Sequence, residues 1–303
     1  HDLCRRQRQM CIRDRLASNA ARGYVSYDAE ADKFSLTPEQ ASVFARESEP
    51  TCIQGLIQGV VGQFVKEDVA IDVFKTGRGR PWGEHHECCF CGTERFFRPA
   101  YAGHLLDEWI PALDGVEDKL KLGAKVADIG CGLGTSSILM AEQFPNSTIH
   151  AFDFHGPSIE EAKKRANEKG LSNLEFFVSD AGEIPKNDYD LACIFDAWHD
   201  MGDPVGIAAS IKETLSKDGT FMVVEPMALD GYANNIANNP ASAMMYGFGT
   251  LVCVPASKAQ SVGLGLGPQA GPSKLMELLS EAGFGNVNLA AETTNNLVLQ
   301  ARG

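Results

Sequence analysis

Three glycines spaced two residues apart follow an apolar run that ends in an acidic residue, in VADIGCGLGT, Val126–Thr135. Gly130, Gly132 and Gly134 would let the backbone turn tightly and approach a ligand closely, because no Cβ intervenes. A dinucleotide site favours the spacing G-x-G-x-x-G, and a phosphate-binding P-loop needs a Lys after its last glycine. This segment has neither pattern. We therefore expect its ligand to lack phosphates.

Acidic residues lie at the ends of three successive apolar runs. Asp128 ends the first, Asp153 ends the second, nineteen residues after Gly134, and Asp180 follows the third. Ligands of open α/β sheets bind at the carboxyl ends of the strands. There Asp153 could accept hydrogen bonds from both ribose hydroxyls of an adenosine, and Asp180 could accept one from the adenine amine. The three carboxylates indicate a ligand that offers donors and positive charge.

Each of these positions also has an ordinary structural interpretation. The glycines could form a plain strand–helix turn, Asp153 could cap a helix ahead of Pro157, and Asp180 could be a turn residue. The recurrence of acids at two further strand ends favours the ligand site.

The elements that would position these residues alternate between short apolar strands and helices. Helical periods lie between most of the strands, which predicts a parallel sheet covered on both faces. The last two strands are separated by five residues, too few for a crossover helix, so we expect them to pair antiparallel. The predicted strands are Lys125–Ile129, Thr148–Phe152, Leu174–Val178, Tyr189–Phe195, Gly219–Glu225, Asn286–Ala290 and Asn296–Ala301.

The region before residue 123 is predicted to be mainly helical. Gly23–Leu36 reads as a small hairpin, and Thr37-Pro38 reads as the cap and first residue of a helix. Helical patterning over 51–76 is followed by a polar, aromatic linker to about Phe97 and by a helix that ends at Pro111. We place the domain boundary near Leu122–Gly123, giving a region 16–122 and a domain 123–303.

The first fifteen residues, His1–Arg15, carry five arginines and two aspartates. We interpret them as a non-native or disordered tail; a basic nucleic-acid arm is the alternative.

Composition narrows the class of protein. Among 303 residues, 44% are hydrophobic and 22% are charged, which excludes a disordered chain. The net charge of −13 disfavours nucleic-acid binding. No apolar run approaches the roughly 20 residues of a membrane span, and no secretory segment opens the chain. Nine scattered cysteines are typical of reduced thiols, so we expect a cytoplasmic location.

From about Leu120 to Gly303 the chain resembles the class I S-adenosylmethionine-dependent methyltransferases. Asp128-x-Gly130-x-Gly132-x-Gly134 is similar to their first motif, Asp153 to their ribose-binding acid, and Asp180-Ala181 to their adenine-contacting pair. The resemblance implies an α/β fold with a seven-stranded, doubly wound sheet in the order 3-2-1-4-5-7-6 and an antiparallel last strand. It implies S-adenosyl-L-methionine as cofactor and a binding set of Asp128, Gly130, Cys131, Gly132, Gly134, Asp153, Phe154, Asp180, Ala181 and Phe195. We expect no metal, because Cys88, Cys89 and Cys91 are not followed by a second pair of ligands at the spacing of a zinc ribbon. The alternative for Cys131 is a small packed side chain.

The segment FDAWHDMGDP, Phe195–Pro204, resembles the region after strand four of plant-type small-molecule O-methyltransferases. This resemblance implies that His199 is a general base and that Glu225, at the end of the fifth strand, orients it. A histidine titrates near neutral pH and is therefore suited to take a proton from a hydroxyl or amine. The alternatives are a supporting or helix-capping role for His199 and a structural acceptor role for Glu225.

A narrower resemblance is to bacterial methyltransferases with an N-terminal winged-helix domain. It rests on Gly23–Phe44, Phe97-Arg98-Pro99, HDMGDP and Gly267-x-x-Ala270-Gly271. The hairpin would be the wing, and the domain would be truncated before it.

We expect a small-molecule acceptor between three segments, 85–101, 198–199 and 233–254. Within the first of these, the cluster His85–Cys91 could be a substrate-facing linker, a plain loop or a metal site. The Met and aromatic residues of 244–248 could form a lid or core. A homodimer is an open alternative for the assembly. The rival functions are a non-catalytic regulator that binds S-adenosylmethionine and a nicotinamide-dependent oxidoreductase.

Overall fold

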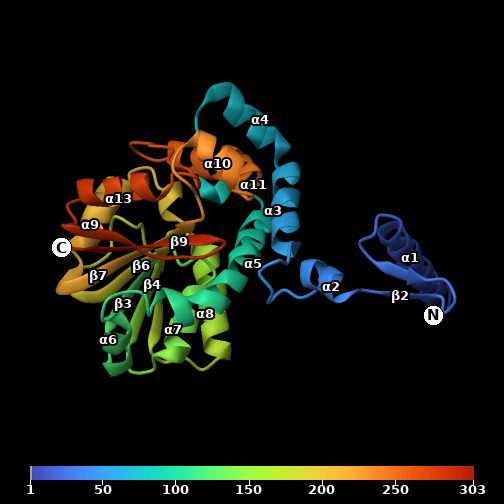
Figure 1. Ribbon diagram of the computed structural model, residues 1–303, viewed down its shortest axis with the longest axis horizontal. Coiled ribbons are helices and arrows are strands. Elements are labelled where there is room, and N and C mark those ends of the chain that lie inside the picture. The colour runs from blue at the N-terminus through green and yellow to red at the C-terminus, as the bar shows by residue number, and fades with distance from the viewer. Residues whose placement is uncertain (1) are drawn as a thin grey trace.

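The computed structural model describes residues 2–303, with side chains from residue 11 onward. Its centre is a seven-stranded sheet in the order β5-β4-β3-β6-β7-β9-β8 (Figure 1). Strand β9 pairs antiparallel with both neighbours, and the other strand pairs are parallel. The predicted order and the antiparallel last strand are therefore confirmed. The strands are β3 Lys125–Ile129, β4 Thr148–Asp153, β5 Leu174–Val178, β6 Tyr189–Phe195, β7 Leu215–Pro226, β8 Asn286–Glu292 and β9 Asn296–Arg302.

Helices cover both faces of this sheet (Figure 1). Alternate residues of each strand enter one of two apolar cores, as the pleat requires. In β3, Val126 lies in the core with α7 and α8, whereas Ala127 lies in the core with α9 and α13. Because the central strands are buried on both faces, their sequences are almost continuously apolar. The covering helices are α6 Val116–Leu122, α7 Thr135–Gln143, α8 Gly156–Glu168, α9 Pro204–Lys212 and α13 Pro272–Glu281.

A second group of helices lies over the carboxyl ends of the strands (Figure 1). Helices α3 (Gln54–Val65) and α5 (Glu87–His104) pack against each other through glycines. A Cβ on Gly92 would lie 2.4 Å from the backbone nitrogen of Gly59, so the two helices touch at backbone distance. The remaining elements of this group are α4 Glu67–Thr76, the 3-10 turns Trp82–Glu84 and Trp198–Asp200, the π-helical turns Leu105–Trp109 and Gly249–Cys253, α10 Tyr232–Asn238, α11 Ser242–Phe248 and α12 Val254–Lys258.

Helix α5 begins earlier than the sequence analysis expected. The predicted linker to Phe97 is wrong from Glu87 onward, where the chain is helical. His86 caps this helix, because its Nδ1 accepts a hydrogen bond from the backbone N–H of Cys88 at 3.2 Å. In the structure Pro99 lies inside α5, whose earlier half is held by the contact with α3.

The chain before α3 forms an arm that extends from the body (Figure 1). The predicted hairpin is confirmed as β1 (Ser26–Asp28) and β2 (Lys33–Ser35). Helix α2 (Pro38–Phe44) is also confirmed, with a capping box in which Thr37 and Gln40 each accept from the other's backbone N–H. The winged-helix assignment of this region stays a prediction.

Helix α1 spans Asp2–Ala20, so residues 2–15 are helical and not disordered, whereas their interpretation as a non-native tail stays a prediction. The segment lacks glycine and proline and carries five Arg, a strong helix former. Its described side chains are mostly exposed, and Arg13 Nη2 lies 2.5 Å from Asp32 Oδ1 of the adjoining hairpin.

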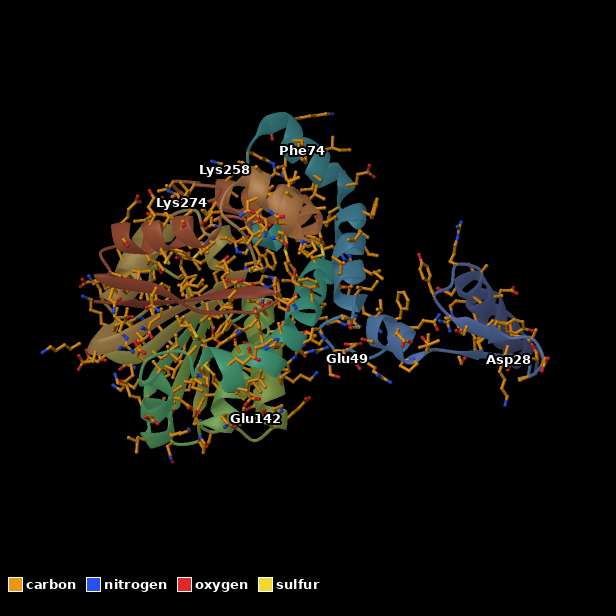
Figure 2. The ribbon with its side chains drawn as sticks, viewed as in Figure 1. Asp28, Glu49, Phe74, Glu142, Lys258 and Lys274 are labelled. Carbon is orange, nitrogen blue, oxygen red and sulfur yellow. The ribbon has the colours of Figure 1, made fainter. Side chains whose placement is uncertain are left out.

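Exposed apolar side chains form a surface on α3 and α4. One of them, Phe74, is labelled in Figure 2. Its large apolar side chains are between 45% and 72% exposed: Ile57, Val61, Phe64, Ile71 and Phe74. Across residues 2–303, we find no helix with the length and apolar character that a bilayer span requires.

Candidate active site and cofactor cleft

The glycine loop after β3 is held against the end of β4. The backbone N–H groups of Gly130 and Cys131 both donate to the carbonyl oxygen of Phe152, at 2.8 and 3.0 Å. Gly134 has φ +78°, and a Cβ there would lie 2.9 Å from the ring of Phe176. Gly132 has φ +53°, but a Cβ there would meet open space. Packing thus leaves no room for a side chain at Gly134, whereas Gly132 faces a cavity.

Asp128 lies beneath this loop, away from the cavity. It is fully buried, and its Oδ2 accepts hydrogen bonds from the hydroxyls of Ser136 (2.6 Å) and Ser137 (2.5 Å) at the start of α7. Burial raises the pKa of Asp128 to about 6, although the two serine hydrogen bonds oppose that rise. Its contacts are those of a residue that fixes the start of α7 against the end of β3.

Asp153 connects the end of β4 to the loop. Its Oδ2 accepts from the backbone N–H of Gly132 at 2.9 Å, and its Oδ1 accepts from the backbone N–H of His155 at 2.8 Å. Burial raises the pKa of this carboxyl, although both backbone hydrogen bonds oppose the rise.

A cleft of about 410 Å³ opens at this edge of the sheet. This volume is within the roughly 300–1,000 Å³ typical of small-molecule sites. Eight of the ten predicted cofactor residues line it: Gly130, Cys131, Gly132, Asp153, Phe154, Asp180, Ala181 and Phe195. Asp128 and Gly134 are outside its lining. Trp82, Phe97, Tyr101 and Asp196 also line the cleft and were not in the predicted cofactor set, although Phe97 and Tyr101 lie in the segment expected around the acceptor.

His199 is buried between two carboxylates. Its Nδ1 is hydrogen-bonded to Oε2 of Glu225, and its Nε2 lies 3.1 Å from Oδ1 of Asp200. The other Glu225 oxygen accepts from the backbone N–H groups of Trp198 and His199, at 3.0 and 3.2 Å. Burial alone lowers the pKa of His199, but the charges of Glu225 and Asp200 outweigh it and raise the pKa well above its ordinary value. The structure thus brings the two predicted catalytic residues together.

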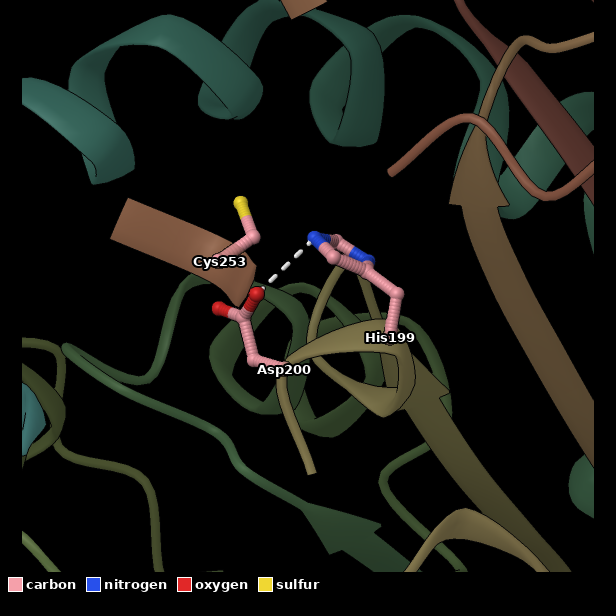
Figure 3. A group of neighbouring side chains, drawn as sticks. All are labelled: His199, Asp200 and Cys253. Atoms are coloured by element: carbon pink, nitrogen blue, oxygen red, sulfur yellow. Dashed lines mark ion pairs between the residues drawn. The ribbon is translucent and has the colours of Figure 1, made fainter. Parts of the chain in front are cut away.

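His199, Asp200 and Cys253 are drawn in Figure 3, where the ring of His199 points toward Asp200. One donor atom from each lies within 4.8 Å of the others. Because Nε2 of His199 belongs to this group, a metal ion here would compete with a proton for the same atom.

A smaller, mainly apolar cavity of about 70 Å³ adjoins the cleft and contains His199. The three segments expected around the acceptor all contribute, through residues such as Thr93, His199 and Met245. Helix α3 also contributes, through Gly55, Leu56 and Gly59, which the sequence analysis did not anticipate. The two cavities share Trp82, Thr93, Phe97, Asp196 and Asp200.

The cluster His85–Cys91 is divided by the start of α5. His85 is buried, and its burial, with Arg80 nearby, lowers its pKa to about 4. Cys89 is buried against α3, where burial raises the pKa of its thiol to about 11. His86 is occupied as a helix cap. His86 is thus used by the helix start, whereas His85 and Cys89 are both buried near Arg80.

The comparisons with known proteins agree with this geometry. Residues 120–283 match the family model of a methyltransferase domain. A sterol 24-C-methyltransferase of Gibberella zeae is 31% identical over 172 residues, which cover 55% of this chain and 42% of that protein. The chain thus spans less than half the length of that relative.

Two solved structures share the fold at low identity. An O-methyltransferase family protein from Burkholderia thailandensis has a TM-score of 0.68 at 13% identity, covering 95% of this chain and 82% of its own. Human N-acetylserotonin methyltransferase, solved with S-adenosylmethionine, has a TM-score of 0.65 at 18% identity, covering 95% and 81%. The chain belongs to the methyltransferase-domain family and has the class I methyltransferase fold.

Proposed function

We propose that this protein transfers a methyl group from S-adenosylmethionine to an oxygen or nitrogen of a small molecule. The observation that carries the proposal is the junction of two cavities. A cofactor-sized cleft at the carboxyl edge of the sheet adjoins an apolar pocket lined by His199, whose ring is hydrogen-bonded to the buried Glu225. Methyl transfer requires donor and acceptor in line at short distance, and two adjoining sites provide that arrangement.

The residues of the cleft fit the cofactor. Gly132 leaves open space where a side chain would stand, and Asp153 adds a carboxylate beside it for the ribose hydroxyls. Asp180 and Ala181 would contact the adenine from the end of β5, with Phe195 on the side of β6. When bound, S-adenosylmethionine supplies an electrophilic methyl group on a sulfonium. Asp128 and Gly134 would shape the loop without touching the ligand.

His199 is the proposed general base. Glu225 accepts from Nδ1, which fixes the ring and directs Nε2 toward the smaller cavity and Asp200. The proton of the acceptor would pass to Nε2 as the new bond to carbon forms. Because the raised pKa keeps the ring protonated near neutral pH, this step requires loss of that proton first, and its rate would rise with pH.

The smaller cavity supports an acceptor that is compact and partly apolar. Its walls include Trp82, Phe97, Met245 and Phe248, and its polar groups gather at Asp196, His199 and Asp200. A flat aromatic molecule with one hydroxyl or amine would fit both the apolar walls and the polar groups of this cavity. We also propose a cytoplasmic location, supported by the free thiols among the described cysteines.

The proposal is tested by methyl transfer from radiolabelled S-adenosylmethionine to a panel of small phenols and aromatic amines. We expect label in at least one acceptor, and a His199→Ala variant should lose roughly 10²–10⁴-fold in turnover while it keeps its affinity for the cofactor. A variant of the half-buried His104, His104→Ala, is the matched control, because this histidine lines neither cavity. Binding of the cofactor without any transfer would favour the regulator instead, and an unchanged rate in His199→Ala would remove this residue from the mechanism.

A further inference from the structure

Asp196 has a left-handed backbone conformation, which is uncommon for a residue other than glycine. It follows β6 directly, with φ +49°, and its backbone N–H donates to the carbonyl oxygen of Val224 at 2.8 Å. A left-handed conformation is strained for residues other than glycine, and such strain gathers at functional sites. Glycine or asparagine would fill this turn as well. The turn alone therefore does not explain why an aspartate stands here, and the contacts of its carboxylate must.

The carboxylate of Asp196 is buried and accepts from two neutral donors. The hydroxyl of Tyr101 donates to Oδ2 at 2.7 Å, and the amide of Asn296 donates to Oδ1 at 2.8 Å. Among the side chains that the structure describes, no Lys, Arg or His nitrogen lies within 4 Å of it. A buried carboxylate without a cation is unfavourable, and burial with the charge of Glu225 raises the pKa of Asp196 well above its ordinary value.

The position of Asp196 indicates which cation would relieve this cost. It lines both the cleft and the smaller cavity, beside Gly130 and Ala197 on one side and His199 on the other. The transferred methyl must cross this junction if the two cavities hold the donor and the acceptor. The positive centre of the donor is the atom that carries this methyl.

We propose that Asp196 is the counter-ion of the cofactor's sulfonium, and that it lets the site distinguish the charged methyl donor from its neutral thioether product. This inference rests on the proposed function. Tyr101 and Asn296 act as positioning residues, because their two hydrogen bonds fix the carboxylate in its plane. After transfer the sulfur is neutral, so Asp196 again lacks a cation and the product is held less tightly relative to the donor.

The test is calorimetric binding of S-adenosylmethionine and S-adenosylhomocysteine to the full chain. Asp196→Asn should weaken binding of the charged ligand about tenfold or more and change binding of the neutral one less than about threefold. Asp196→Gly should give the same result, and glycine suits the left-handed backbone, so this variant protects the test against misfolding. Asp188→Asn is the matched control, since Asp188 is another left-handed aspartate (φ +51°) that is exposed and outside both cavities.

Three outcomes are distinguishable. A fall in the preference for the charged ligand in both Asp196 variants, with no change in Asp188→Asn, supports the inference. Equal weakening of both ligands would overturn it, because Asp196 would then only shape the cleft. Failure of the unaltered chain to bind either ligand would contradict the proposed function itself.

Discussion

At the scale of single residues, the buried group around His199 determines the chemistry that the pocket can perform. Two carboxylates face one imidazole, one at each ring nitrogen. Glu225 lies on a strand and is fixed by two backbone N–H groups, whereas Asp200 adjoins His199 in the same short turn. The fixed partner orients the ring, and the neighbouring one lies where an acceptor would approach.

This arrangement predicts how His199 titrates. Burial disfavours the charged ring, but Glu225 and Asp200 favour it more strongly, so its pKa lies well above the ordinary value. Glu225→Gln removes one of these charges and should lower the pKa. Histidine Cε1–H resonances followed by NMR across pH would measure it, with His199→Ala to assign the signal. An unchanged pKa of His199 in the Glu225→Gln variant would contradict the assigned partnership.

At the scale of elements, the glycine loop has two distinct functions that substitutions can separate. Gly134→Ala meets both a strained φ and the ring of Phe176, so we expect a loss of stability. Gly170→Ala has a similar φ of +67° in open space and should cost only the strain, about 1–2 kcal/mol. Urea unfolding should show a further loss of about 1–3 kcal/mol in Gly134→Ala. Equal losses would contradict the tight packing.

Gly132→Ala should behave like Gly170→Ala in unfolding but lose cofactor affinity, because its Cβ would enter the cleft.

The strands were predictable from the sequence, but the helices over the sheet edge were predictable only in part. Buried parallel strands are almost wholly apolar, so their bounds are visible in a single sequence. Helix α5 begins in the polar, cysteine-rich run after His85, where local composition resembles a loop. Its helical state depends on the close contact of Gly92 with Gly59, thirty-three positions earlier, which no local pattern reveals.

The candidate site divides in the same way. The loop Gly130–Gly134 and the acids at strand ends follow a local rule of α/β sheets. Asp196 was missed because its partners, Tyr101 and Asn296, lie 95 and 100 positions away in the chain.

At the scale of the whole molecule, the apolar surface on α3 and α4 predicts self-association. Helix α3 carries no charged residue, in a chain of net charge −13, so two copies can approach along α3 without charge repulsion. Helix α4 carries three acids and one lysine beside its apolar side chains. A second copy of this chain would bury Phe64 and Phe74, which are 72% and 64% exposed. We therefore expect a homodimer that joins through this surface.

Light scattering should give twice the chain mass of 32.7 kDa, and Phe64→Asp with Phe74→Asp should give the single mass. Tyr232→Asp, at an exposed aromatic residue elsewhere, should leave the dimer intact. A single-chain mass for the unaltered protein would refute this assembly.

The most direct measurement of the central claim is calorimetric titration of the whole chain with S-adenosylmethionine and with S-adenosylhomocysteine. We predict one site for each ligand, and at least a tenfold loss of affinity for both in Asp153→Ala, whose carboxylate lies in the cleft. Asp218→Asn, exposed at the opposite end of the sheet, should bind as the unaltered chain does. Absence of heat with both ligands, or full affinity in Asp153→Ala, would contradict the account.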